Sequence, residues 1–107
     1  MAMATLFSDT YMTSNEQQQR DHEVYSLCRD VIDRESFLTF ASAFMSLRKD
    51  VENGKLPDNW ESGTIASFLY GAIAWAEASN FGTRQDLSDE NPWGQFAAFL
   101  YCGKIYE

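Results

Sequence analysis

Apolar side chains recur with the period of an α-helix in several separate stretches of this chain. In the clearest stretch, Phe37, Phe40, Phe44, Leu47 and Val51 fall near one stripe, because residues three, four and seven positions apart lie on the same side of a helix. No stretch shows the alternation of apolar and polar residues that is typical of a half-buried strand. The pattern therefore predicts an all-α fold, a compact bundle of three to four helices.

Capping residues indicate where the helices begin. Ser14 followed by Gln17 fits a capping box for the first helix, and Asp33 can cap the second. Ser62 or Thr64 can cap the third, because a hydroxyl oxygen accepts a hydrogen bond from a free N–H group of the first turn. We predict helices over about residues 15–30, 34–53, 64–79 and 92–106.

The helical stripes also predict the core. With Ile65 as the centre of the stripe on the third helix, Tyr70 points about 140° away and is expected on the exposed side. On the last helix the expected inner stripe includes Trp93, Phe96 and Tyr101, and neighbouring apolar residues make the apolar arc unusually wide. This helix is therefore either central to the bundle or offers a second face to a partner.

Length and composition support one domain. The chain has 107 residues, of which 45% are hydrophobic and 15% aromatic. This length supports one hydrophobic core but not two, and the apolar content can offset the chain entropy lost on folding. Residues 1–13 show no sustained period and are rich in turn-forming side chains, so we expect a mobile lead-in there. Residues 14–107 are expected to form a single helical domain.

The charge balance restricts the partners. Sixteen acidic residues against eight basic ones give a formal net charge of −8. Such a field repels nucleic acids and anionic membranes, so we expect neither as a direct partner. No apolar run reaches the roughly 18 residues of a membrane span, and the first residues lack the basic start of a signal peptide. We expect a cytoplasmic protein with a protein partner, and a basic toxin or enzyme would match its charge.

The sequence offers no recognisable site for catalysis, a metal or a cofactor. His22 is the only histidine, and we expect it on the polar side of its helix, away from Cys28. Cys28 and Cys102 lack CxxC spacing, so both are interpreted as small buried hydrophobes without a disulfide. Neither a glycine-rich phosphate loop nor a Ser-His-Asp arrangement is present. We therefore expect a binding protein and not an enzyme.

Two basic residues, Arg48 and Lys104, fall at the edges of apolar stripes. Long basic side chains in such positions usually extend their charged ends to water. We therefore expect both charges to be solvated. A buried ionisable group on an apolar stripe would instead be a reason to consider an enzymatic site.

Exposed aromatic and acidic side chains form the expected partner-binding surface. Aromatic residues are common interface anchors, and acidic residues accelerate association with a basic partner. The candidate anchors and steering charges are Tyr70, Trp75, Phe99, Tyr106, Asp86, Asp89 and Glu90.

Three motifs in a fixed order resemble a family of short, acidic, uncharacterised bacterial proteins. They are RESFLxF at residues 34–40, WExxTIxxFL at 60–69, and PWxxFA at 92–97 followed by IYE at 105–107. The resemblance covers about residues 31–107. It implies a bacterial source and a setting among small proteins that accompany toxins, without an assigned activity.

Small size, acidity, the lack of catalytic residues and this resemblance favour an inhibitor or immunity-type protein. Such a protein neutralises a cognate toxin by occluding a functional surface. One alternative is a phage or mobile-element protein that blocks a defence complex by charge mimicry, although the scattered acids do not supply regular carboxylate spacing. The other is a homo-oligomeric structural or adaptor module.

Overall fold

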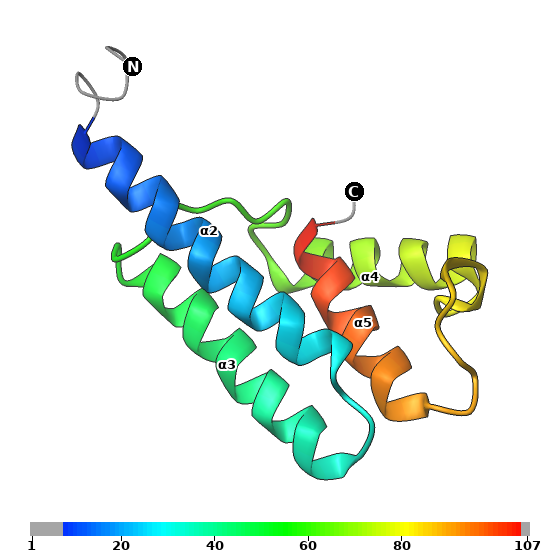
Figure 1. Ribbon diagram of the computed structural model, residues 1–107. Helices are drawn as coiled ribbons and strands as arrows, with labels where there is room; N and C mark the ends of the chain where they lie inside the picture. Colours follow the sequence, from blue (N-terminus) through cyan, green and yellow to red (C-terminus); the bar gives the residue numbers. More distant parts are fainter. Residues whose placement is uncertain (1–7, 106–107) are drawn as a thin grey trace.

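The computed structural model describes residues 8–105, which form four α-helices and one short 3-10 turn (Figure 1). These described residues contain no β-strand, so the prediction of an all-α bundle is confirmed. The elements are α2 (Ser8–Arg29), α3 (Arg34–Glu52), α4 (Ile65–Ser79), η1 (Thr83–Gln85) and α5 (Pro92–Ile105).

Local capping fixes the starts of α3 and α4. The backbone N–H of Ser36 donates to Asp33 Oδ1 at 2.8 Å, while the backbone N–H of Asp33 donates to Ser36 Oγ at 3.1 Å. Thr64 and Ser67 form the same reciprocal arrangement at the start of α4. Two otherwise free donors are satisfied at each helix start. The predicted caps Asp33 and Thr64 are thus confirmed, and Ser62 does not cap.

Helix α2 begins at Ser8, earlier than the predicted start at about residue 15. The predicted capping box at Ser14 lies inside the helix and does not start it. Residues 8–14 contain neither glycine nor proline, so nothing in this segment interrupts the helical backbone. Part of the predicted mobile lead-in is therefore helical, and its first seven residues lie outside the described part of the chain.

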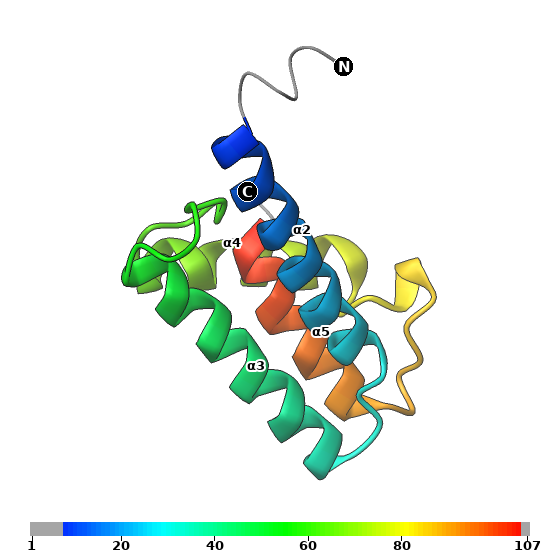
Figure 2. The same ribbon diagram turned by 60° about the vertical axis from the view of Figure 1, so that its left-hand side comes forward.

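Helix α5 is the centre of the bundle. It packs against α2, α3 and α4, whereas α4 packs on α5 and on η1, and α2 lies beside α3 (Figures 1 and 2). The main core therefore forms between α2, α3 and α5. Its buried residues are Val24, Cys28, Val31, Phe40, Phe44, Leu47, Leu56, Ala97 and Tyr101.

The buried sides of α4 and α5 differ from the predicted stripes. Ile65 is 80% exposed, and the buried side of α4 is formed by Gly71, Ala72, Trp75, Ala76 and Ser79. On α5, Tyr101 is buried as predicted, but Trp93 and Phe96 are exposed. Among the described residues, α4 packs mainly on α5 and the η1 turn, and Phe68 also reaches Phe44 of α3, so part of the apolar stripe of α4 is left uncovered.

Candidate functional site

Six exposed apolar side chains lie along α4 and on the elements beside it. Ile65, Leu69 and Ile73 are four residues apart on α4 and form one row along that helix. The row is flanked by Met45 of α3 at one end and by Phe81 and Phe96 at the other. We call this surface, an exposed apolar row with hollows at its two ends, the α4 trough. Its six residues are Met45, Ile65, Leu69, Ile73, Phe81 and Phe96, all exposed.

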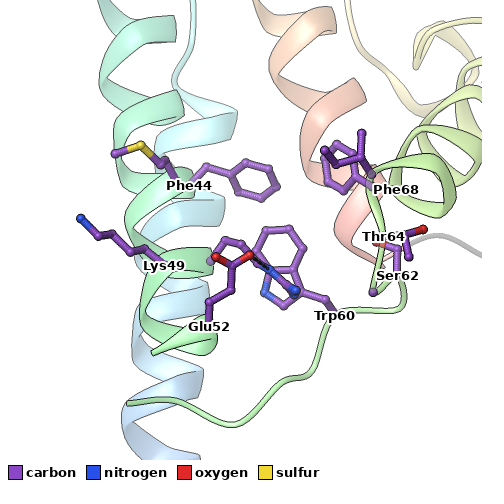
Figure 3. A pocket seen from close by; sticks show the side chains of 11 residues that line it. Phe44, Lys49, Glu52, Trp60, Ser62, Thr64 and Phe68 are labelled. Carbon is purple, nitrogen blue, oxygen red and sulfur yellow. Dashed lines mark hydrogen bonds and ion pairs between the residues drawn. The ribbon is translucent and has the colours of Figure 1, made fainter. Parts of the chain in front are cut away.

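One end of the α4 trough opens into an aromatic pocket of about 650 Å³ between α3, the 60–65 segment and α4. Its floor is formed by Phe44, Trp60 and Phe68, whose rings point toward one another in Figure 3. The ring centroids of Phe44 and Trp60 are 5.1 Å apart, and those of Trp60 and Phe68 are 6.1 Å apart. These distances are those of favourable aromatic pairs, so the floor is a fixed apolar platform.

The other end of the α4 trough consists of two neighbouring hollows that share Phe81. One is lined by Ile73, Glu77, Phe81 and Phe99, and the other includes Phe81, Asp89 and Phe96. The Phe81 and Phe99 rings stack with their centroids 5.8 Å apart. This end therefore combines an apolar floor with a carboxylate in each hollow.

Trp60 is held in place by cations on α3 and α5. The Arg48 guanidinium carbon lies 5.1 Å from its ring centroid, and the Lys104 Nζ lies 5.6 Å from it. The backbone N–H of Glu61 donates to the carbonyl of Lys104 at 2.8 Å, and Ser62 Oγ donates to the carbonyl of Gly103. These contacts attach the segment before α4 to the end of α5, and cation–π attraction adds to them.

The expectation that Lys104 extends to water is wrong. Lys104 is 2% exposed, and its Nζ lies 3.6 Å from Asp21 Oδ1 on α2. Arg48 is partly exposed, and it forms ion pairs with Glu52 at 3.1 Å and Asp58 at 3.5 Å. Lys104 is covered because the 60–62 segment and α2 close over the end of α5, which a helical stripe alone does not reveal.

The residues proposed from sequence as anchors do not form one surface. Tyr70 is 73% exposed as predicted, but it lies about 100° around α4 from Leu69. Trp75 is 3% exposed, and its indole N–H donates to Gln85 Oε1 at 2.9 Å, so it is a core residue and not an anchor. Phe99 is half-buried under Phe81, and Tyr106 lies outside the described residues.

The acidic candidates Asp86, Asp89 and Glu90 are all exposed in the loop before α5. Of these three, Asp89 borders the α4 trough. The sequence did not single out Met45, Leu69 and Ile73, because a helical period predicts which side of a helix is apolar and not whether another element covers it. Their exposure depends on which elements pack over them, and the separate helical patterns do not encode that packing.

The two cysteines are free thiols, Cys28 buried and Cys102 partly buried. They come from α2 and α5 and line the same cavity of about 560 Å³ beside Trp75 and Tyr101. Burial raises the pKa of Cys28 to about 12, with a smaller contribution from the charge of Cys102, and burial raises the pKa of Cys102 to about 11. Thiols of this kind are protonated and poorly nucleophilic at neutral pH.

The raised thiol pKa values predict a loss of stability at alkaline pH. In the unfolded chain both thiols ionise at about pH 8.5 to 9, whereas in the folded protein they stay protonated to higher pH. The free energy of unfolding should therefore fall as pH rises from about 9 toward 12, by up to about 2 kcal/mol per thiol at pH 10. Urea unfolding at pH 8 and pH 10 checks this. Between these two pH values, Cys28→Ala is expected to lose less stability than the wild-type protein. An equal loss would contradict it.

His22 is exposed on α2, as expected. The described side chains include no group of three or more His, Cys, Asp and Glu residues placed to hold a metal ion. Within residues 8–105, no helix combines the length and the apolar character that crossing a membrane requires.

Comparison with known proteins identifies a family but no characterised relative. Neither the curated proteins nor the solved structures gave a match. The sequence of residues 33–107 matches a family described as a family of unknown function, DUF7660. The matched segment contains α3, α4 and α5 and both ends of the α4 trough, while α2 lies outside it. The chain thus belongs to the DUF7660 family.

Proposed function

We propose that this chain is a small bacterial binding protein of the inhibitor or immunity type. It acts in the cytoplasm and neutralises a basic protein, such as a toxin or enzyme, by covering a functional surface of that protein with its α4 trough. The observation that carries the proposal is the row of uncovered apolar side chains on α4, continued by Met45 at one end and by Phe81 and Phe96 at the other.

Clustering of these side chains supports binding. Single exposed apolar residues are ordinary on protein surfaces, but a contiguous patch rimmed by polar groups is typical of an interaction site. Each of these side chains that a partner covers contributes to the binding free energy, by roughly 25 cal/mol per Å² of apolar surface removed from water. The aromatic pocket supplies the type of well-formed hollow in which interface anchors bind.

The net charge of −8 supports a basic partner. Complementary charge raises the association rate and suppresses acidic competitors. Glu77 and Asp89 border the hollows of the α4 trough, and Asp86 and Glu90 lie exposed in the same loop as Asp89. The steering charge therefore lies beside the apolar contact surface. We propose direct binding of a protein and neither nucleic-acid binding nor catalysis.

The test compares trough variants with matched surface variants. A partner is captured by the wild-type protein from a bacterial lysate, purified, and titrated against Leu69→Ala, Phe96→Ala, Tyr70→Ala and Ile32→Ala. We expect the first two to weaken binding by tenfold or more, because they remove side chains from the α4 trough. Tyr70 and Ile32 are more exposed but lie outside it, so their variants should bind within about threefold of wild type.

Unfolding measurements on all four variants provide the control, because a loss of binding must not come from a loss of structure. Equal binding by trough and control variants would reject the α4 trough as the interface. If the wild type captures no other protein, and its mass in solution is that of a dimer, the self-associating adaptor replaces the inhibitor as the preferred function.

A further inference from the structure

We infer that the α4 trough binds an amphipathic helix with an aromatic anchor at one end and basic residues about three helical turns away. This inference rests on the proposed function and specifies the partner segment. The anchor enters the aromatic pocket over Phe44, Trp60 and Phe68, and the basic residues lie over Glu77 and Asp89.

The backbone of the surrounding elements favours a helix as the bound segment. The trough is built from α3, α4, α5 and short turns, and the described residues offer no strand edge for an extended segment to pair with. A segment that covers this apolar surface loses water from its backbone on the covered side, and a helix satisfies its backbone hydrogen bonds internally. The row Ile65, Leu69, Ile73 is a ridge of the kind that packs into the groove of another helix.

The charges differ between the two ends of the α4 trough. At the pocket end, Arg48 is paired with Glu52 and Asp58, and Lys49 forms no ion pair among the described residues, which leaves this end close to neutral. At the other end, Glu77 and Asp89 line the hollows, also without an ion pair among the described residues.

One cation lies near the acidic end. Arg84 Nη1 donates a hydrogen bond to the carbonyl oxygen of Ala78 at 3.2 Å. Its single positive charge offsets only part of the negative charge of the four acids at this end, Glu77, Asp86, Asp89 and Glu90. The balance at this end is therefore negative. A basic group of the partner is attracted to it, while an apolar anchor without charge suits the neutral pocket at the other end.

The length of α4 sets the spacing between anchor and charge. Ile65 borders the aromatic pocket, and Glu77 lines the hollow at the far end, twelve residues later on the same helix. A rise of about 1.5 Å per residue separates the two by about 18 Å. A helix lying alongside α4 needs a similar separation, about twelve residues, between its aromatic anchor and its basic residues.

Two synthetic helical peptides of identical composition test this arrangement. Both carry one apolar stripe, one tryptophan and three lysines; the lysines are centred about twelve residues from the tryptophan in the first peptide and about four in the second. We expect the first peptide to bind the wild-type protein about tenfold more tightly at low salt, measured by fluorescence anisotropy. The Glu77→Lys/Asp89→Lys variant should bind the two peptides equally. Because both proteins are titrated with the same two peptides, a difference in peptide helicity affects both proteins alike and does not change the comparison.

Each outcome decides one part of the inference. Equal affinity of the two peptides for the wild-type protein would overturn the spacing, while the α4 trough itself stays tested by Leu69→Ala and Phe96→Ala against the native partner. If neither peptide binds while Phe96→Ala still weakens binding of the native partner, the inference that a helix occupies the α4 trough is overturned. A dimer of the protein that Phe96→Ala dissociates would show that a second copy occupies the trough, and would also overturn it.

Discussion

Replacing Asp21 with leucine is expected to lower the free energy of unfolding by about 3 kcal/mol. The substitution leaves the ammonium of Lys104 buried without its carboxylate, which lies 3.6 Å away on α2. It also removes the hydrogen bond that Asn59 Nδ2 donates to Asp21 Oδ2 at 2.7 Å. The attraction of Lys104 to the Trp60 ring cannot compensate, because a cation–π contact contributes about 2 kcal/mol at most in a desolvated site.

Urea unfolding of the single and double variants checks this interpretation. The double variant Asp21→Leu/Lys104→Met should recover most of the lost stability, since a buried ion pair can be replaced by apolar side chains at little cost. Glu23→Leu serves as the control, because Glu23 is an exposed acid on the same helix. If Asp21→Leu and Glu23→Leu lose the same stability, the pairing of Lys104 with Asp21 does not support the fold.

Replacing Phe40 with alanine is expected to lower the free energy of unfolding by about 3 to 5 kcal/mol. Phe40 is fully buried, and its ring lies 5.3 Å from that of Phe44 and 6.4 Å from that of Phe37, measured between centroids. The substitution removes this packing and leaves a cavity that the surrounding helices fill only in part. Domains of this size are stable by about 5 to 15 kcal/mol, so the variant will be close to unfolding.

The control for Phe40 is on the same helix. Leu38→Ala removes an apolar side chain that is already about half exposed, and it should cost less than about 1 kcal/mol. Where Phe40→Ala does not fold at all, Phe40→Leu provides an intermediate value by the same urea measurement. A Phe40→Ala variant as stable as Leu38→Ala would show that the core is not centred on this ring.

Much of the fold could be predicted from the sequence because the signals that define helices are local. The stripe of α3 and the caps at Asp33 and Thr64 depend on residues a few positions apart, and the structure contains all of them. The start of α2 could not be placed, because residues 8–14 contain serine and threonine that fit a cap or a helix surface equally well.

The site was less predictable because exposure depends on neighbours distant in sequence. Ile65 and Trp75 both lie on the apolar part of α4, and the packing of α4 on α5 and on the segment around η1 decides that Trp75 is buried and Ile65 exposed. The wide apolar arc of α5 was the one useful signal. The interpretation of α5 as central to the bundle is confirmed, since α5 contacts the other three helices, while a face offered to a partner stays a prediction.

Helix α2 has a consequence for where an autonomous folding unit can be cut from this chain. The family match starts at residue 33, after α2 has ended. Yet α2 contributes Val24 and Cys28 to the core, and Arg20 of α2 forms an ion pair with Asp50 of α3 at 2.9 Å. A fragment trimmed to the matched residues would expose one side of α3 and α5 to water. It would also leave Lys104 without the carboxylate of Asp21, its ion-pair partner on α2. Excision of the family segment alone should therefore yield an aggregation-prone polypeptide, and expression trials should retain α2.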